Sequence, residues 1–317
     1  MTVDQLIPVT AKRNVVPRRR YGRLVSLAVL AVLAAMMINA LVTNEAFEWA
    51  VVRNFFLSRS VLHGLLVTLE LTAIAMLIAI GLGIALAIMR LSPNSVIANC
   101  ARAYIWFFRG TPLLVQLIFW FNLSALYPRL TLGVPFGPSL VEMNTNALIT
   151  PFIAAIVGLS LNEAAYMAEV VRGGLLSVST GQTEAAAALG MRGGLAMRLI
   201  ILPQAMRVIV PPTGNQVIGM LKTTSLVSII ATQDLLYSVQ LIYSRTFEVI
   251  PMLIVACLWY LLVTTILTFA QSRIERHYGR STRSAPARRW LRKSQRTTPA
   301  AGSRPTLQKS FTGSDGS

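Results

Sequence analysis

The sequence predicts an all-α membrane protein with six transmembrane helices. Hydrophobic residues make up 54% of the 317 residues, charged residues only 13%, and the mean hydropathy is +0.60, a composition that soluble domains do not have. Apolar runs of about 20 residues, the length that crosses a hydrocarbon core, recur along the chain. The net charge of +17 lies mostly at the two ends and between these runs. We therefore interpret the charge as a topology signal and not as a nucleic-acid surface.

The first 60 residues are predicted to form a tail, a membrane anchor and an interfacial segment. Residues 1–23 are basic and contain two prolines, which indicates a cytoplasmic tail. Residues 24–43 form an uncharged apolar run, the first span. A cleaved signal peptide is the alternative, but this run is longer than a usual signal core and no small-residue cleavage site follows it. The next segment, up to residue 60, mixes charges with aromatic residues such as Trp49, as expected at an outer membrane interface.

Five further spans follow, and the positive charges orient them. The spans are predicted at residues 62–89, 104–127, 147–168, 207–237 and 251–270, with a short loop over residues 90–102 and a Pro- and Gly-rich outer loop up to residue 146. Residues 274–317 are basic and poor in apolar residues, which predicts disorder. With the N-terminus inside, the outer segments hold only Arg53, Arg59, Arg129 and Arg245. The positive-inside rule therefore places both termini in the cytoplasm.

Residues 181–203, between the fourth and fifth spans, predict a helix, a glycine turn and a second helix on the cytoplasmic side. Ser179 and Gln182 have the spacing of a capping box that starts the first helix. Gly190 suits a left-handed helix stop. Apolar residues at helical spacing then predict a second helix, which we expect Pro203 to end because proline has no N–H for the helical ladder.

This segment also carries a family resemblance. Seven of its residues match the pattern E-A-A-x3-G-x9-I-x-L-P, which resembles the EAA loop of binding-protein-dependent ABC importer permeases: Glu184, Ala185, Ala186, Gly190, Ile200, Leu202 and Pro203. The strings FFRGTPLLVQ, AAYMAEVVRGG and LKTTSLVS resemble signatures of the polar amino acid uptake branch. The resemblance covers about residues 63–273. It implies a type I ABC importer permease core of five helices within residues 61–273, to which residues 24–43 add an N-terminal helix.

The resemblance implies a permease subunit in the bacterial plasma membrane that imports a polar amino acid or related solute. Its implied partners are ABC ATPase subunits, a second permease in a homodimer or heterodimer, and an external solute-binding protein. The seven matching residues would couple the permease to the ATPase, which would bind ATP and magnesium. The chain itself has no G-x-x-x-x-G-K-[ST] string, so we expect it to have no cofactor and no enzymatic activity. The alternatives are an ATP-independent channel or secondary carrier, and a membrane scaffold.

Polar residues within the predicted spans indicate candidate positions on the translocation pathway, because ionised groups are costly in a bilayer and face protein or water. The candidates are Lys222, Glu163, Asn162, Glu70, Gln216, Thr223 and Thr224. For Lys222 a structural ion pair is favoured over a gating role and over substrate contact. For Glu163 an interhelical hydrogen bond is favoured over contact with a substrate amino group. The sequence does not determine which amino acid is carried.

Overall fold

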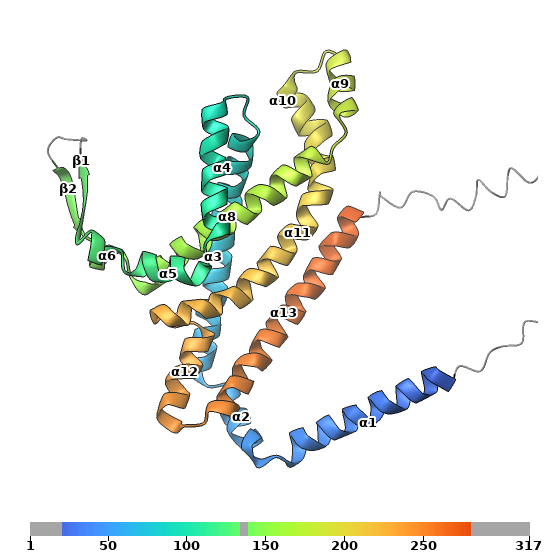
Figure 1. The fold of residues 1–317 in the computed structure, drawn as a ribbon, viewed down its shortest axis with the longest axis vertical. Helices are drawn as coiled ribbons and strands as arrows, with labels where there is room; N and C mark the ends of the chain where they lie inside the picture. Colours follow the sequence, from blue (N-terminus) through green and yellow to red (C-terminus); the bar gives the residue numbers. More distant parts are fainter. Residues whose placement is uncertain (1–20, 134–138, 280–317) are drawn as a thin grey trace, which may run out of the picture. The chain divides into compact units, whose positions relative to one another are not determined.

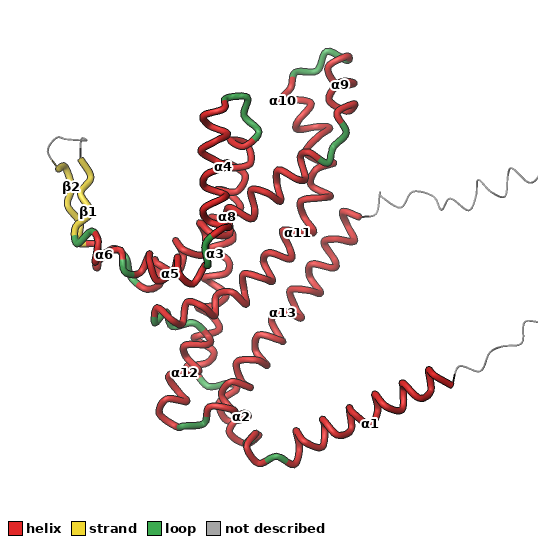
Figure 2. The backbone as a smooth tube through the Cα atoms, viewed as in Figure 1, coloured by secondary structure: helices red, strands yellow, loops and turns green. Residues whose placement is uncertain are grey.

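The structure is a computed structural model that describes residues 21–133 and 139–279. The described residues contain five helices long and apolar enough to cross a membrane, or up to six if one bent pair counts as a single span (Figure 1). Helices dominate these residues, and strands occur in one short hairpin (Figure 2). Most of both predicted tails, residues 1–20 and 280–317, lies outside the described residues.

The chain folds into two compact units, each assembled from distant segments. The first contains Met1–Ala75, Leu113–Leu159 and Leu221–Val263, and the second contains Met76–Pro112, Ser160–Met220 and Thr264–Ser317. Four long helices contribute a segment to each unit: α3 (Arg59–Arg90), α8 (Pro151–Leu176), α11 (Leu202–Thr223) and α13 (Val249–Gly279). Helix α8 continues beyond the predicted end at residue 168, and α13 includes residues 274–279, which were predicted to belong to the tail.

The predicted N-terminal span is helix α1 (Tyr21–Thr43). None of its apolar window is buried inside the chain, as expected for a helix whose neighbours are lipids or another protein. A 3-10 turn (Glu45–Phe47) and helix α2 (Trp49–Phe56) follow. The Trp49 indole N–H donates to the Leu41 carbonyl at 2.9 Å, so the aromatic segment is hydrogen-bonded to the end of the anchor helix.

The core of the first unit lies where α2, α3, α12 (Leu235–Thr246) and α13 meet. It consists of Val52, Val61, Leu235, Val239, Met252, Val255 and Ala256. Asp234 caps α12, since its carboxylate accepts hydrogen bonds from the backbone N–H groups of Leu236 and Tyr237. The Leu235 N–H donates to the Thr68 hydroxyl of α3 at 3.0 Å. These bonds hold α12 against the first half of α3.

The predicted fifth span, residues 207–237, is wrong at both ends. Its helix begins earlier, within residues 181–203, and changes to a 3-10 helix, Thr224–Ile230, before the chain turns at Ala231 with φ 57°. Hydroxyl groups favour the tighter helix, because Thr224 and Ser225 bond back to the carbonyls of Leu221 and Lys222. Residues 235–237 belong to α12, which Asp234 starts as a separate helix.

The predicted third span, residues 104–127, is also wrong as a continuous helix. Helix α4 (Ser95–Gly110) and helix α5 (Leu113–Phe121) are bent by 100° at the break between them. Pro112 disfavours helical geometry at the residue before it, and Thr111 is extended, with φ −114° and ψ 143°. Helix α4 also begins earlier than expected, because Asn94 caps it by accepting from the Val96 N–H at 2.9 Å. The predicted loop over residues 90–102 therefore contains only residues 91–94.

The predicted outer loop contains a β-hairpin that was not predicted from the sequence. Strands β1 (Arg129–Gly133) and β2 (Ser139–Asn144) pair antiparallel between the short helices α6 (Leu123–Leu126) and α7 (Thr145–Leu148). The Arg129 guanidinium and the Glu142 carboxylate form an exposed ion pair at 3.4 Å across the two strands. Most of the Pro and Gly residues that suggested a loop lie at positions 133–138, from the last residue of β1 to the residue before β2.

Candidate functional site

The segment that resembles the EAA loop begins with helix α9 (Thr180–Ala188). Ser179 is its N-cap residue, as predicted, but the predicted capping box is wrong because the Ser179 side chain makes no cap hydrogen bond. The Gln182 N–H instead donates to the Ser179 backbone carbonyl at 3.0 Å. The side-chain amide nitrogen of Gln204, in α11, donates to the side-chain oxygen of Gln182 at 3.4 Å. This weak contact joins the first helix of the segment to the span that follows.

Gly190 ends helix α9 in the left-handed conformation, which confirms the prediction for this residue. Its φ is +73°, a value that residues with a Cβ rarely adopt. The Gly190 N–H donates to the Ala187 carbonyl at 2.9 Å, and the next N–H, of Met191, donates to the Ala186 carbonyl at 3.0 Å. These two bonds satisfy carbonyls at the helix end in the manner of a Schellman turn. The chain direction after α9 therefore depends on a glycine at this position.

Pro203 does not end the second helix, contrary to the prediction. Helix α10 (Gly193–Ala196) runs into a π-helical turn, Met197–Ile201, and then into α11 without interruption. The Leu202 N–H bonds to the Met197 carbonyl, five residues back. Pro203 is the second residue of the α-helix that follows this wider turn, and a proline in a first turn is tolerated. π-helical turns are frequent at functional sites.

The seven residues of the EAA pattern differ in exposure. Glu184, Ala185, Gly190, Leu202 and Pro203 are exposed, and Ile200 is half-buried. Ala186 is only 1% exposed. We infer that Ala186 packs against its own segment and that close approach to a partner involves the other alanines of α9. Leu189 and Leu199, which the sequence placed in the two helices but not among the coupling residues, are 80% and 59% exposed and add apolar surface to the same segment.

Two of the predicted pathway residues are buried neighbours on α8, in the second unit. The Asn162 amide donates to the Phe108 carbonyl of α4 at 2.9 Å, so Asn162 forms an interhelical hydrogen bond. Glu163 is 9% exposed, and its Oε1 atom has no hydrogen-bond partner among the described residues. The interhelical bond that the sequence favoured for Glu163 is therefore absent at this oxygen. A buried acceptor without a donor is costly, which makes Glu163 a candidate for contact with a cargo cation.

The other predicted pathway residues are not gathered around Glu163. Lys222 is exposed in the last turn of α11, and the ion pairs of the described residues do not include it. The structural ion pair expected for Lys222 is therefore not formed within the described part of the chain. Glu70 is exposed on α3, Gln216 and Thr223 are half-buried, and Thr224 is buried.

A large apolar cavity lies within the second unit. Its volume is about 870 Å³, and segments of α3, α8, α11 and α13 line it. Met167 of α8 lines the cavity, and Glu163, four residues earlier, lies on the same helix face. Gln271 and Glu275 also line it, and the Gln271 amide donates to Glu275 at 2.7 Å and to the Pro211 carbonyl at 3.2 Å. Both polar residues lie beyond residue 270, where the predicted sixth span ends.

Comparison with known proteins identifies the family to which this chain belongs. Residues 79–280 match the model of the family described as binding-protein-dependent transport system inner membrane component. The arginine transport system permease protein ArgU of Corynebacterium glutamicum is 45% identical over 285 residues, covering 89% of this chain and 87% of that protein. The nopaline transport system permease protein NocM of Agrobacterium fabrum is 37% identical over 201 residues, covering 63% of this chain and 80% of that protein.

Solved structures agree with the sequence comparison. A crystal structure of an amino acid ABC transporter with histidines matches with a TM-score of 0.58 and 35% identity, covering 69% of this chain and 94% of that chain. The MetNI methionine ABC transporter in an inward-facing conformation matches with a TM-score of 0.55 at 20% identity, a likeness of fold. The chain therefore belongs to the family of binding-protein-dependent transport system inner membrane components, as the multi-pass, non-catalytic permease subunit of an ABC importer that works with a separate ATPase and a binding protein.

Proposed function

We propose that this permease imports a polar amino acid, with arginine as the first candidate. The observation that carries this proposal is the 45% identity to an arginine permease over 89% of the chain. The buried Glu163 carboxylate supports it, because its Oε1 has no donor among the described residues and an ammonium or guanidinium group would supply one. In the proposed orientation both termini and residues 181–203 face the cytoplasm.

The exposed face of residues 181–203 is proposed as the contact with the ATPase subunits. It offers the Glu184 carboxylate as an acceptor and Leu189 and Leu199 as apolar contacts, all exposed. The turn at Gly190 and the continuous helix through Pro203 hold this face on the end of α11. A displacement of the loop would therefore be transmitted to the span that follows. ATP and magnesium would be bound by the ATPase alone.

Uptake by a reconstituted complex tests this function. We expect liposomes containing the permease, its ATPase and its second permease subunit to accumulate labelled arginine only with internal ATP and external binding protein. Unlabelled lysine and ornithine should compete, and glutamate should not. Flux without ATP hydrolysis would instead establish a channel or secondary carrier, and an absence of flux with all partners present would favour a scaffold. Preferential competition by acidic amino acids would reject the proposed cargo class.

Replacing Glu163 with glutamine tests its contact with the cargo. The substitution keeps the shape of the side chain and removes its charge. Loss of a charged hydrogen bond of about 1.5–3 kcal/mol should lower arginine uptake by roughly 10- to 100-fold and reduce the preference for basic over neutral amino acids. Glu142→Gln, at the exposed hairpin, is the matched control and should leave uptake unchanged. An unaltered cargo profile in Glu163→Gln would show that this carboxylate does not contact the cargo.

A further inference from the structure

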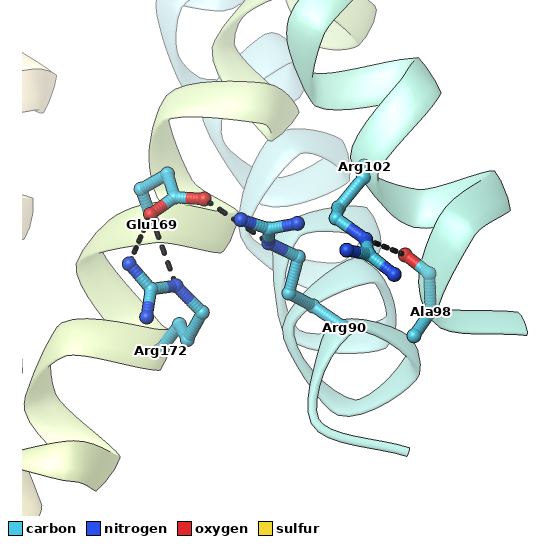
Figure 3. A network of polar contacts seen from close by, with 5 residues as sticks. All are labelled: Arg90, Ala98, Arg102, Glu169 and Arg172. Atoms are coloured by element: carbon cyan, nitrogen blue, oxygen red, sulfur yellow. Dashed lines mark hydrogen bonds and ion pairs between the residues drawn. The ribbon is translucent and has the colours of Figure 1, made fainter. Parts of the chain in front are cut away.

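A cluster of arginines surrounds a single carboxylate in the second unit. Glu169 of α8 accepts two hydrogen bonds from Arg172, at 3.0 Å from Nε and 2.7 Å from Nη2. Its other oxygen lies 3.6 Å from Nε of Arg90, the last residue of α3. Figure 3 shows the Arg90 guanidinium between the side chains of Glu169 and Arg102, with Arg102 coming from α4. Three neighbouring helices therefore contribute charges to one cluster.

The cluster carries more positive charge than its own residues neutralise. Three guanidinium groups face one carboxylate, which leaves a formal surplus of two positive charges. The Arg102 Nε donates to a carbonyl of its own helix, Ala98, at 3.4 Å, and no ion pair among the described residues includes Arg102. The Arg90 Nε is inaccessible to solvent and has no hydrogen-bond partner among the described residues. Within the described residues, Glu169 therefore pairs with two of the three guanidinium groups, those of Arg90 and Arg172, and not with Arg102.

The cluster is partly exposed, and the length of α3 is compatible with a position among the lipid headgroups. The side chains of Arg90, Glu169 and Arg172 are 27%, 23% and 30% exposed. Helix α3 has 32 residues and so is about 48 Å long, whereas the hydrocarbon core is about 30 Å thick. At least one of its two ends, Arg59 or Arg90, therefore projects past the core, and we place the Arg90 end in the headgroup region because Arg102 and Arg172 lie beside it. An anion at this depth can reach the guanidinium groups without crossing hydrocarbon.

We propose that Arg90, Arg102 and Arg172 form a binding site for the phosphate of an anionic phospholipid, such as phosphatidylglycerol. Guanidinium groups bind phosphate oxygens through charge-assisted, often paired hydrogen bonds. Basic pockets between transmembrane helices are suited to anionic headgroups. The lipid phosphate supplies negative charge that the cluster lacks, and Glu169, which pairs with Arg90 and Arg172, competes with it for these two groups. The bound lipid joins α3, α4 and α8 at one end of the second unit.

Native mass spectrometry of the purified transporter complex tests this site. Complexes incubated with phosphatidylglycerol or phosphatidylcholine are compared for the lipid that they retain. We expect selective retention of phosphatidylglycerol, weakened about fivefold for each arginine removed and so about 25-fold in the Arg90→Gln/Arg102→Gln variant, since each cation is worth about 1 kcal/mol near an anionic surface. The Arg53→Gln/Arg245→Gln variant removes two exposed arginines of the first unit and should retain the lipid as the wild type does.

Two further variants separate lipid binding from a purely structural role. Glu169→Gln removes the competing anion and should strengthen phosphatidylglycerol retention about fivefold, although it breaks both internal ion pairs. Arg90→Lys/Arg102→Lys keeps the charges and should retain the lipid within about threefold of the wild type. Equal retention of both lipids, equal losses in the first-unit control, or weaker retention in Glu169→Gln would overturn the proposal. Displacement of the lipid by millimolar inorganic phosphate would assign the site to a soluble anion. None of these readouts depends on the cargo.

Discussion

Gly190→Pro is expected to abolish ATP-driven uptake while leaving the membrane spans folded. Proline fixes φ near −65°, and Gly190 has φ +73°. The substitution also removes the N–H that donates to the Ala187 carbonyl at 2.9 Å. A cost of about 3 kcal/mol lowers the population of the native turn about a hundredfold. The measurement is arginine uptake and ATP hydrolysis by the reconstituted complex, together with co-purification of the ATPase.

Gly193→Pro is the matched control within the same segment. Gly193 is the first residue of α10, where proline is well accepted, and Arg192 before it is already extended, with φ −65° and ψ 143°. No neighbouring atom lies within 4 Å of a Cβ at Gly193. Gly193→Pro should therefore transport normally. Normal uptake in Gly190→Pro, with the ATPase still bound, would exclude this turn from coupling.

Gly64→Ala is expected to destabilise the first unit more than an exposed substitution does. An added Cβ would lie 2.7 Å from the backbone carbonyl oxygen of Asp234 and 2.4 Å from the Ser238 hydroxyl. The Ser238 hydroxyl can rotate away, but the Ser238 Cβ, 2.8 Å from the added atom, cannot. The capped first turn of α12 cannot move without losing its hydrogen bonds to Asp234 and Thr68. We expect the free energy of unfolding to fall by about 2–3 kcal/mol. Thermal unfolding of the purified complex, with and without this change, measures the effect.

Gly81→Ala, on the same helix, controls for the chemistry of the substitution. No atom lies within 4 Å of a Cβ built at Gly81, so the only effect expected is the better helix propensity of alanine, up to about 1 kcal/mol in favour of folding. The two variants should therefore shift the melting temperature in opposite directions. A melting temperature for Gly64→Ala at or above that of the wild type would contradict the close contact between α3 and α12.

The fold class and the family followed from local properties of the sequence. Membrane spanning depends on the length and hydropathy of a run, so residues 24–43 and 62–89 were placed close to α1 and α3. The left-handed turn at Gly190 depends on one residue without a Cβ and was predicted for that reason. The EAA pattern is itself a contiguous string, and the family comparison agrees with it. Its coupling role remains a prediction.

Helix ends and pairings were decided by contacts between distant residues. The predicted break at Pro203 is absent because a π-helical turn precedes it, and the predicted span to residue 237 ends early because Asp234 and Thr68 start α12 as a separate helix. Lys222 was expected to pair and does not, among the described residues, whereas Arg90 meets Glu169 from another helix. A single sequence shows which side chains can form hydrogen bonds or ion pairs. Only the packing of the helices determines which of them lie close enough to do so. For this reason the sequence identified a membrane permease, and the tertiary structure alone revealed the arginine cluster around Glu169 and the Glu163 oxygen that has no partner in the described part of the chain.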